Sequence, residues 1–381
     1  MPMLDPKRPF DLPPLLRGSV PMGEWESVEV LRACIKANKA LAGLKEAAAL
    51  LPNPDVMLSS LVLLESQASS EIENIVATAD ALFQYAARDP ATADRAVKET
   101  LQYRESLYHG LDQLRTRPLA TTLIEEICSL TKGMEMRVRK VPGTALVNAR
   151  TQETIYTPPQ GEALLREMLA DWERFCHAEE TDDLRGGEID PLVRMAVLHY
   201  QFEAIHPFLD GNGRAGRVLN LLYLVDKGLL ASPVLYLSRY ILKHRSRYYA
   251  LLLAVSREGT AQAWQAWLLY MLEAVRETAV WTLEKIKAIA RLMHSTHEQI
   301  QRDTKLGNQK SLVELIFRLP YCRVADVVQA RIAQRQTAAV YLQTLVGTGL
   351  LQMQANGREK LYLNHRLIDL LKYEASPGDV A

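Results

Sequence analysis

Apolar residues recur at the spacing of an α-helix through most of the chain. In the first such stretch, 24–51, one apolar face is predicted at Val28, Leu31, Ile35, Leu41 and Leu44. The same pattern predicts further helices over 55–73, 91–114, 118–134, 161–177, 190–205, 218–226 and 264–302. Asp190-Pro191 supplies an N-cap and a first-turn proline for one of them. The predicted fold class is therefore mostly α.

Residues 141–159 instead alternate between apolar and polar side chains, which is typical of β-strands. The alternation lies on both sides of a polar turn at Asn148-Ala149-Arg150-Thr151, and Pro158-Pro159 ends it. This stretch is predicted to be a β-hairpin. It is the one obvious β element in the first two thirds of the sequence.

Residues 305–373 differ in kind, because their elements are shorter. Three helices are predicted over 312–318, 324–332 and 334–346, followed by two strands over 350–353 and 360–363. Between the strands lies Asn356-Gly357, which favours a type I′ turn. This is the order of a winged helix-turn-helix, whose third helix reads DNA. That helix carries Arg335 and Gln336 but few other basic groups, so DNA binding, protein binding and dimerisation all remain open.

The length of 381 residues suits two or three domains. We expect an N-terminal helical region over 1–114, a helical core over 115–302 and the winged-helix domain over 305–381. Lys plus Arg and Asp plus Glu both number 45, so the net charge gives no global reason to expect nucleic acid or an anionic membrane as partner.

No stretch has the length and lack of charge of a membrane span, and residues 1–17 lack the apolar run of a secretion signal. We therefore expect a cytoplasmic protein without a membrane partner. The four cysteines are scattered and form no Cys-x-x-Cys pair, so they are interpreted as reduced thiols.

The densest chemistry lies at 206–217, which reads His-Pro-Phe-Leu-Asp-Gly-Asn-Gly-Arg-Ala-Gly-Arg. Its glycines allow positive φ and expose backbone N–H groups, at Gly211, Gly213 and Gly216. These groups precede the predicted helix 218–226, and the N-terminus of a helix favours an anion. Arg214 and Arg217 add permanently charged donors that suit phosphate oxygens.

Three more side chains of this stretch have a predicted role. Asp210 is a hard oxygen ligand of the kind that holds Mg²⁺ beside phosphates. His206 is the one group here that can move a proton near neutral pH. Phe208 is expected to point into the core and anchor the loop. The chain has no Walker-type P-loop or Rossmann glycine pattern, so the common nucleotide-binding folds are excluded.

Position for position, 206–217 resembles the signature of Fic-domain proteins, His-x-Phe-x-(Asp/Glu)-Gly-Asn-Gly-Arg-x-x-Arg. The resemblance implies transfer of AMP from ATP to a Ser, Thr or Tyr hydroxyl of a target protein, or of the chain itself. It implies that His206 is the general base and that Asp210 holds Mg²⁺ at the α- and β-phosphates. The other phosphate-binding residues implied are Gly211, Asn212, Gly213 and Gly216, with Arg214 for the β-phosphate and Arg217 for the γ-phosphate.

A second motif lies in the predicted helix 55–73, where 69–74 reads Ser-Ser-Glu-Ile-Glu-Asn. Taken alone it is a polar helix turn. In Fic proteins, however, (Ser/Thr)-x-x-x-Glu-(Gly/Asn) marks an inhibitory helix, here expected over about 55–78, and Ser69, Glu73 and Asn74 fit it. The resemblance implies that Glu73 pairs with Arg217 and so occupies the donors of the γ-phosphate.

Two other features gain a function from the same resemblance. The hairpin would be the flap that binds a target segment through main-chain pairing, with Val147, Asn148, Ala149 and Arg150 facing the target. A tyrosine pair at this distance past the motif helps to form the adenine and ribose pocket, which makes Tyr248 a candidate. His199 lies on the apolar face of helix 190–205 and is interpreted as a core or supporting histidine.

Several other activities remain as alternatives. Fic relatives that move phosphate or phosphocholine usually carry an altered motif, so the unaltered motif here argues against them. Removal of AMP, with Glu73 activating water, is a second alternative. A third is a DNA-binding regulator with a Fic core as its sensor, which the winged helix favours and the neutral charge weakens. The sequence does not reveal the target, whether the chain is a homodimer, or what relieves inhibition.

Overall fold

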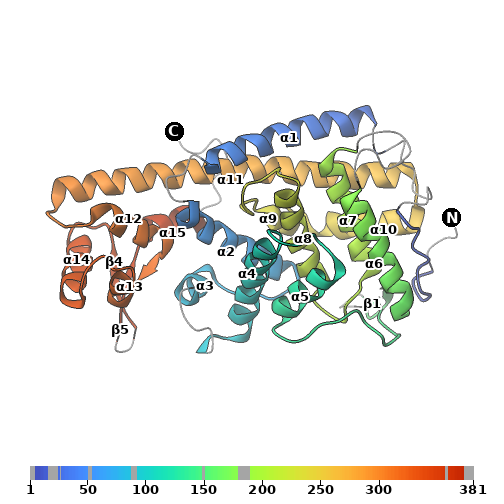
Figure 1. The fold of residues 1–381 in the computed structure, drawn as a ribbon, viewed down its shortest axis with the longest axis horizontal. Helices are drawn as coiled ribbons and strands as arrows, with labels where there is room; N and C mark the ends of the chain where they lie inside the picture. Colours follow the sequence, from blue (N-terminus) through green and yellow to red (C-terminus); the bar gives the residue numbers. More distant parts are fainter. Residues whose placement is uncertain are drawn as a thin grey trace.

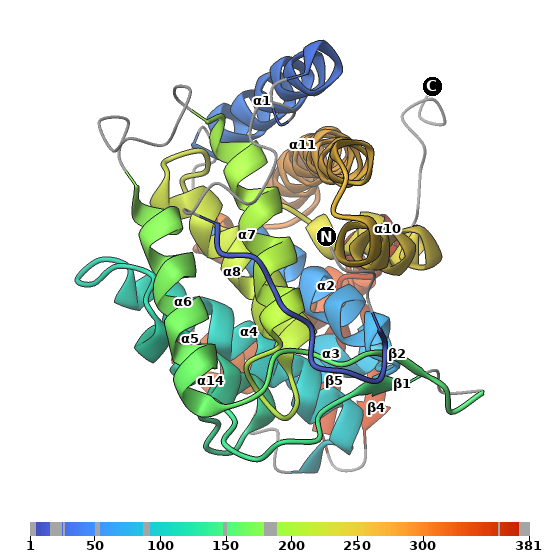
Figure 2. The same cartoon turned by 90° about the vertical axis from the view of Figure 1, so that its right-hand side faces the viewer.

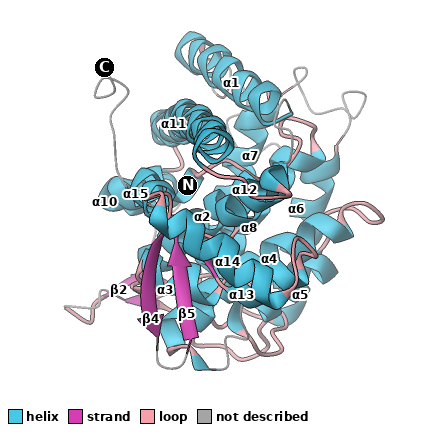
Figure 3. Cartoon of the chain, turned by 90° about the vertical axis from the view of Figure 1, so that its left-hand side faces the viewer, coloured by secondary structure: helices cyan, strands magenta, loops and turns pink. Residues whose placement is uncertain are grey.

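The computed structural model describes residues 5–15, 25, 27–49, 54–86, 92–147, 151–178, 189–356 and 359–372. Within these ranges the fold is mostly helical, as predicted, with two small antiparallel sheets (Figure 3). All four cysteines are buried and free. No helix in the described ranges is long and apolar enough to cross a membrane. The predicted hairpin tip at Asn148, Ala149 and Arg150 lies outside the described residues, as does Gly357 of the second predicted turn.

One helix of 43 residues, α11 (Ala261–Asp303), runs along nearly the whole length of the molecule (Figure 1). Helix α1 (Val28–Ala49) packs along it. The buried face of α1 consists of Val30, Cys34, Ala37, Leu41, Leu44 and Ala48. The apolar face predicted at Val28, Leu31 and Ile35 was wrong, because these three side chains are exposed. Val30, Cys34 and Ala37 form the first half of this buried face, and the last two carry a weak hydrophobic signal.

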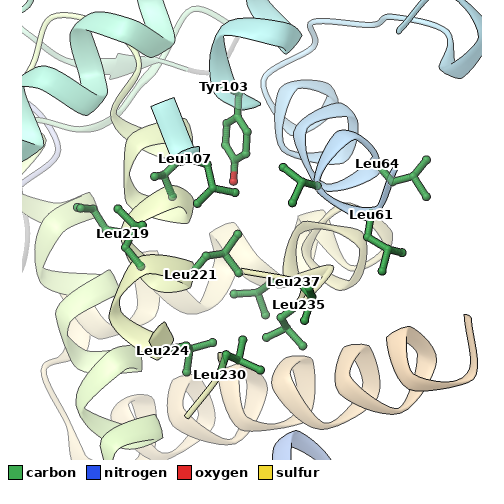
Figure 4. Packing of buried hydrophobic residues seen from close by; sticks show 14 of the residues in the cluster. Leu61, Leu64, Tyr103, Leu107, Leu219, Leu221, Leu224, Leu230, Leu235 and Leu237 are labelled. Atoms are coloured by element: carbon green, nitrogen blue, oxygen red, sulfur yellow. The ribbon is translucent and has the colours of Figure 1, made fainter. Parts of the chain in front are cut away.

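The centre of the core is a pair of helices, α7 (Pro191–Ile205) and α8 (Asn212–Asp226), and nearly every residue of both is buried. Around them pack α2 (Pro54–Ile72), α4 (Arg95–Gln113), α5 (Thr121–Lys132) and α6 (Glu162–His177) (Figure 2). Asp190 caps α7 by accepting a hydrogen bond from the Leu192 N–H at 2.8 Å, as predicted. Leucines from α2 and α8 meet in one apolar cluster, together with Tyr103 and Leu107 of α4 (Figure 4).

The predicted hairpin is confirmed as β1 (Leu146–Val147) and β2 (Thr154–Tyr156), which pair antiparallel. Its base is fixed to the end of α7, because the buried Tyr156 hydroxyl donates to the Ala204 carbonyl at 2.7 Å. Three further helices complete this part of the chain: α3 (Ala79–Tyr85), α9 (Leu237–Lys243) and α10 (Arg245–Glu258).

The C-terminal elements follow α11 directly. They are α12 (Gln309–Arg318), β3 (Tyr321–Cys322), α13 (Val324–Gln329), α14 (Arg335–Gly347), β4 (Gln352–Asn356), β5 (Glu359–Leu363) and α15 (His365–Lys372). The three strands form one sheet in the order β3-β5-β4. This arrangement is compatible with a winged helix, which stays a prediction, as do the domain boundaries. Two elements of this module were not predicted, the two-residue strand β3 and the helix α15. The short helix α3 was not predicted either.

The C-terminal module touches the N-terminal helices at a defined place. Helix α12 packs against α2. The Tyr321 hydroxyl donates to Asp80 Oδ1 at 2.5 Å, and Lys372 Nζ lies 2.6 Å from Asp80 Oδ2. The helix that carries the predicted inhibitory motif is therefore in contact with both the core and the C-terminal module.

Candidate active site

The signature 206–217 forms the connection between the two central helices. His206 ends α7 in the left-handed conformation, with φ of 49°, and Gly211 precedes α8 with φ of 84°. Phe208 is fully buried, as predicted. The Asn212 carboxamide accepts from the Phe208 N–H and donates to the Phe208 carbonyl, both at 2.9 Å. The side chain of Asn212 is therefore occupied in closing the loop, and only its backbone N–H remains to bind an anion.

Helix α8 begins at Asn212, six residues earlier than predicted from the apolar run at 218–226. The first turns of α8 were not predicted, because glycines and polar residues interrupt the apolar periodicity there. As a result Gly213, Arg214 and Arg217 lie on the helix itself. The N–H groups of its first turn have no intrahelical acceptor, so an anion is favoured there.

His206 lies beside this turn in a largely desolvated position. Desolvation, together with the nearby Arg139 guanidinium, lowers the pKa of His206 to about 4. The imidazole is therefore neutral at pH 7 and able to accept a proton. Arg139 also fixes the loop, because its Nε donates to the His206 carbonyl and its backbone N–H to the Pro207 carbonyl, both at 2.9 Å. Arg139 was not predicted from the sequence, where nothing distinguishes it from a surface arginine.

Arg217 is buried, and the predicted inhibitory motif surrounds it. Its Nη2 lies 2.8 Å from Glu73 Oε1. Its Nε donates to Ser69 Oγ at 2.8 Å, and Nη2 also donates to the Ser69 carbonyl at 2.9 Å. A Cβ atom at Gly213 would lie only 2.4 Å from Glu73 Oε1. The Glu73 carboxylate thus occupies the anion-binding turn of α8, and only a glycine leaves room for it.

The sequence placed Glu73 in the helix, whereas α2 ends at Ile72 and Glu73 lies in the following turn. Asn74 has a φ of 61°, a conformation that favours glycine or asparagine. Its Oδ1 accepts from Arg245 Nη1 at 2.9 Å. Asn74 therefore forms the left-handed turn that follows α2, directly after Glu73.

Arg214 is also buried, and its partner was not predicted. Its Nη1 lies 3.1 Å from Glu99 Oε2 on α4. The same carboxylate accepts from Arg95 Nε at 2.7 Å and lies 3.9 Å from Lys132 Nζ. A lone glutamate on an amphipathic helix gives no sequence signal for such a contact.

Asp210 is the candidate metal ligand, and 63% of its side chain is exposed. Partial burial would raise the pKa of Asp210, but the hydrogen bond and charge of Lys132 outweigh it and lower the pKa below its usual value. Among the described residues no three His, Cys, Asp or Glu side chains gather into a metal cluster. Mg²⁺ at nucleotide sites is commonly held by one or two carboxylates plus substrate phosphates. A single accessible carboxylate beside an anion-binding turn fits that donor set.

Three models of known protein families match this chain. A model of the Fic/DOC family matches residues 116–224, and one of the Fic/DOC family N-terminal region matches 31–112. A model of the C-terminal domain of protein adenylyltransferase SoFic-like proteins matches 292–367. Each covers a consecutive part of the chain, in the order of the elements above. The chain belongs to the Fic/DOC family.

Known relatives of this Fic protein share short segments with it. Protein adenylyltransferase fic-1 of Caenorhabditis briggsae is 36% identical over 95 residues, which cover 25% of this chain and 16% of that protein. A probable protein adenylyltransferase of Aquifex aeolicus (strain VF5) is 52% identical over 42 residues, covering 11% of this chain and 13% of the relative. The chain therefore matches less than a fifth of the length of these relatives.

The fold of this Fic protein is also found in solved structures. A Fic family protein from Desulfovibrio desulfuricans G20 superposes with a TM-score of 0.54 at 17% identity, over 89% of this chain and 96% of that one. A Fic domain-containing signalling protein from Bacteroides thetaiotaomicron gives a TM-score of 0.51 at 16% identity, over 66% and 97%. At this level of identity the likeness establishes the fold alone.

The tyrosine pair of this Fic protein lies on α10. Tyr248 is buried, and its hydroxyl is 2.8 Å from Nε2 of the buried His199, which takes the supporting place expected of it. Tyr249 is the accessible member, with 42% exposure. The structure therefore places Tyr248 in the core, whereas the exposed Tyr249 ring lies 5.9 Å from the Arg245 guanidinium.

Proposed function

We propose that this Fic protein transfers AMP from ATP to a hydroxyl group of a target protein or of itself, and that Glu73 inhibits the transfer. The observation that carries the proposal is the Glu73 carboxylate, which lies against the first turn of α8 and pairs with Arg217 at 2.8 Å. An acidic group of the chain itself thus occupies a site built for an anion. The names of the matched relatives, which are protein adenylyltransferases, support the same activity.

The neutral His206 imidazole takes the proton of the target hydroxyl as its oxygen attacks the α-phosphorus. The new oxygen–phosphorus bond forms as the bond to the pyrophosphate oxygen breaks, and His206 later returns its proton to solvent. The N–H groups at the start of α8 bind phosphate oxygens, and Arg214 and Arg217 provide positive charge beside them. Asp210 would hold Mg²⁺, which offsets charge on the leaving pyrophosphate.

The target segment would bind to the hairpin. Strand β1 pairs with β2 alone among the described residues, so its other edge is open. Leu146 and Val147 are exposed there. An open edge binds an extended peptide through backbone hydrogen bonds. We propose this edge as the place where the target is held across from His206.

The proposal is tested with the purified chain, Mg²⁺ and ATP labelled at either the α- or the γ-phosphate. We expect label from α-labelled ATP to appear on protein, and the H206A variant to lose this transfer. The H294A variant is a matched control, because His294 is exposed on α11. Retention of γ-label, or undiminished transfer by H206A, would contradict the proposal.

A further inference from the structure

Both carboxylate oxygens of Asp210 already have a partner in the chain. Oδ1 accepts from the Gly211 N–H at 2.6 Å. Oδ2 lies 2.6 Å from Nζ of Lys132, the last residue of α5. The Lys132 side chain is only 11% exposed, whereas that of Asp210 is 63% exposed. A largely buried cation thus pairs with the one accessible carboxylate of the signature.

The position of Lys132 is built into the fold. Its aliphatic part lies against Gly211, where a Cβ atom would come within 3.1 Å of Lys132 Cγ. Gly211 also has a φ of 84°, which disfavours any other residue. Close approach of the lysine stem and the left-handed turn therefore both require this glycine.

Lys132 also has a second acceptor within reach. Its Nζ lies 3.9 Å from Glu99 Oε2, so a small movement carries the ammonium from one carboxylate to the other. Glu99 is held in place by Arg214 and Arg95. The ammonium can leave Asp210 without becoming an unpaired buried charge, which would be costly.

We propose that Lys132 is a resident counter-ion of Asp210, which a divalent cation must displace before this carboxylate can bind it. The displaced ammonium moves to Glu99. A free cation gains only one carboxylate by this exchange, whereas a cation that arrives with nucleotide phosphates brings most of its ligands with it. Asp210 therefore binds the metal–nucleotide complex in preference to the metal alone. The preference for a metal–nucleotide complex rests on the proposed AMP transfer, but the displacement of Lys132 by a cation does not.

The test measures binding of Mn²⁺ to the full chain without nucleotide, by the loss of the free Mn²⁺ signal in electron paramagnetic resonance. The variants are K132M, K132R, D210N and the double variant K132M/D210N. K140M is the matched control, because Lys140 pairs with Glu162 at 3.5 Å and is 72% exposed. Circular dichroism of each variant shows that it is folded.

We expect K132M to bind one Mn²⁺ about tenfold more tightly than the wild type, since a unit charge beside the carboxylate is removed. K132R and K140M should bind as the wild type does, and K132M/D210N should lose the gain. The proposal is overturned if K132M binds Mn²⁺ no more tightly than the wild type, if K132R gains as much as K132M, or if the gain persists without Asp210. Because this readout needs no catalysis, a failure of AMP transfer and a failure of this proposal are distinguishable.

Discussion

Glu73 and Arg217 are 144 residues apart in the chain and form an ion pair with 2.8 Å between Oε1 and Nη2. The guanidinium is buried, whereas the carboxylate is one-third exposed. A buried arginine needs a partner, and ligand phosphates could replace Glu73 in that role. While this pair is intact, it holds the end of α2 against α8 and Glu73 occupies the phosphate site. Phosphates that replace Glu73 would therefore also break a contact that holds α2.

Removing the Glu73 carboxylate should activate the protein. We expect Glu73→Gly to raise the rate of AMP transfer by about tenfold or more, which corresponds to a competition of about 1.4 kcal/mol. Arg217→Ala should lower the rate with or without Glu73, because a phosphate-binding group is lost in both cases. Autolabelling of the wild type, both single variants and the double variant measures this. Glu71→Gly is the matched control on the last turn of α2, and equal activation by it would contradict the mechanism.

The pH dependence of transfer should reflect the lowered pKa of His206. A base acts when it is unprotonated. As the pH falls from neutral, kcat/KM should therefore stay constant until the pH approaches about 4, where His206 becomes protonated. His206→Ala should lower the rate by about a hundredfold or more at neutral pH. Half-maximal kcat/KM near the ordinary pKa of histidine would contradict the lowered pKa of His206.

Acid stability supplies an independent check on the same residue. The folded pKa of His206, about 4, lies below its ordinary value of 6.5, so the unfolded chain takes up the proton first as the pH falls. The stability that His206 contributes is fully present above about pH 6.5 and declines toward pH 4. Buried His199, whose pKa burial lowers to about 3, adds a loss of the same sign. Urea unfolding of H206A and the wild type at several pH values should show a shallower decline for H206A.

Gly216 should be intolerant of a side chain although it lies within a helix. A Cβ atom there would come within 2.6 Å of Glu203 Oε1 and 3.1 Å of Phe202 Cδ1 on α7. We expect Gly216→Ala to lower the free energy of unfolding by about 1–3 kcal/mol, because the buried side chains of Glu203 and Phe202 must shift to admit the methyl group. Gly347→Ala on α14 is the control, since nothing lies within 4 Å of its added Cβ atom. Thermal unfolding compares the two, and equal melting temperatures would refute the packing argument.

Asp80 has two partners in the C-terminal module, Lys372 and Tyr321, and they should contribute unequally to the stability of the protein. Lys372 and Asp80 have side chains 40% and 46% exposed, so a double-mutant cycle should give a coupling of only about 0.2–1 kcal/mol. Tyr321 is buried, and Tyr321→Phe should cost about 1 kcal/mol by removing its hydrogen bond to Asp80. A larger effect of Lys372→Ala than of Tyr321→Phe on urea unfolding would contradict this order.

Candidate site residues could be predicted from the sequence where their chemistry lies in one contiguous motif. His206, Asp210 and Arg217 could be found because glycines, a carboxylate and arginines are concentrated in one stretch. The contact of Glu73 with Arg217 was predicted from a second motif, and the structure contains it. The inhibitory effect of that contact stays a prediction.

Glu99, Lys132 and Arg139 could not be found in the same way. Each lies in a segment where charged side chains are common, and each becomes distinctive only when the fold brings it beside the signature. The face of α1 was wrong for a related reason, because Cys34 and Ala37 carry a weaker hydrophobic signal than the exposed Leu31 and Ile35. Tertiary packing, which decides these cases, has no local pattern.

The uninterrupted helix α11 fixes the distance between the core and the C-terminal module. Its 43 residues extend about 65 Å, at about 1.5 Å per residue. Helix α7, which ends at His206, packs on it, as do α12 and α15 of the C-terminal module. A macromolecule gripped by that module would therefore present its hydroxyl groups at a set span from the imidazole. Inserting one residue into α11 would change that span slightly but rotate the two ends by about 100° relative to each other. If the chain modifies target hydroxyls as proposed, the choice among them would depend on distance and orientation as well as on local sequence.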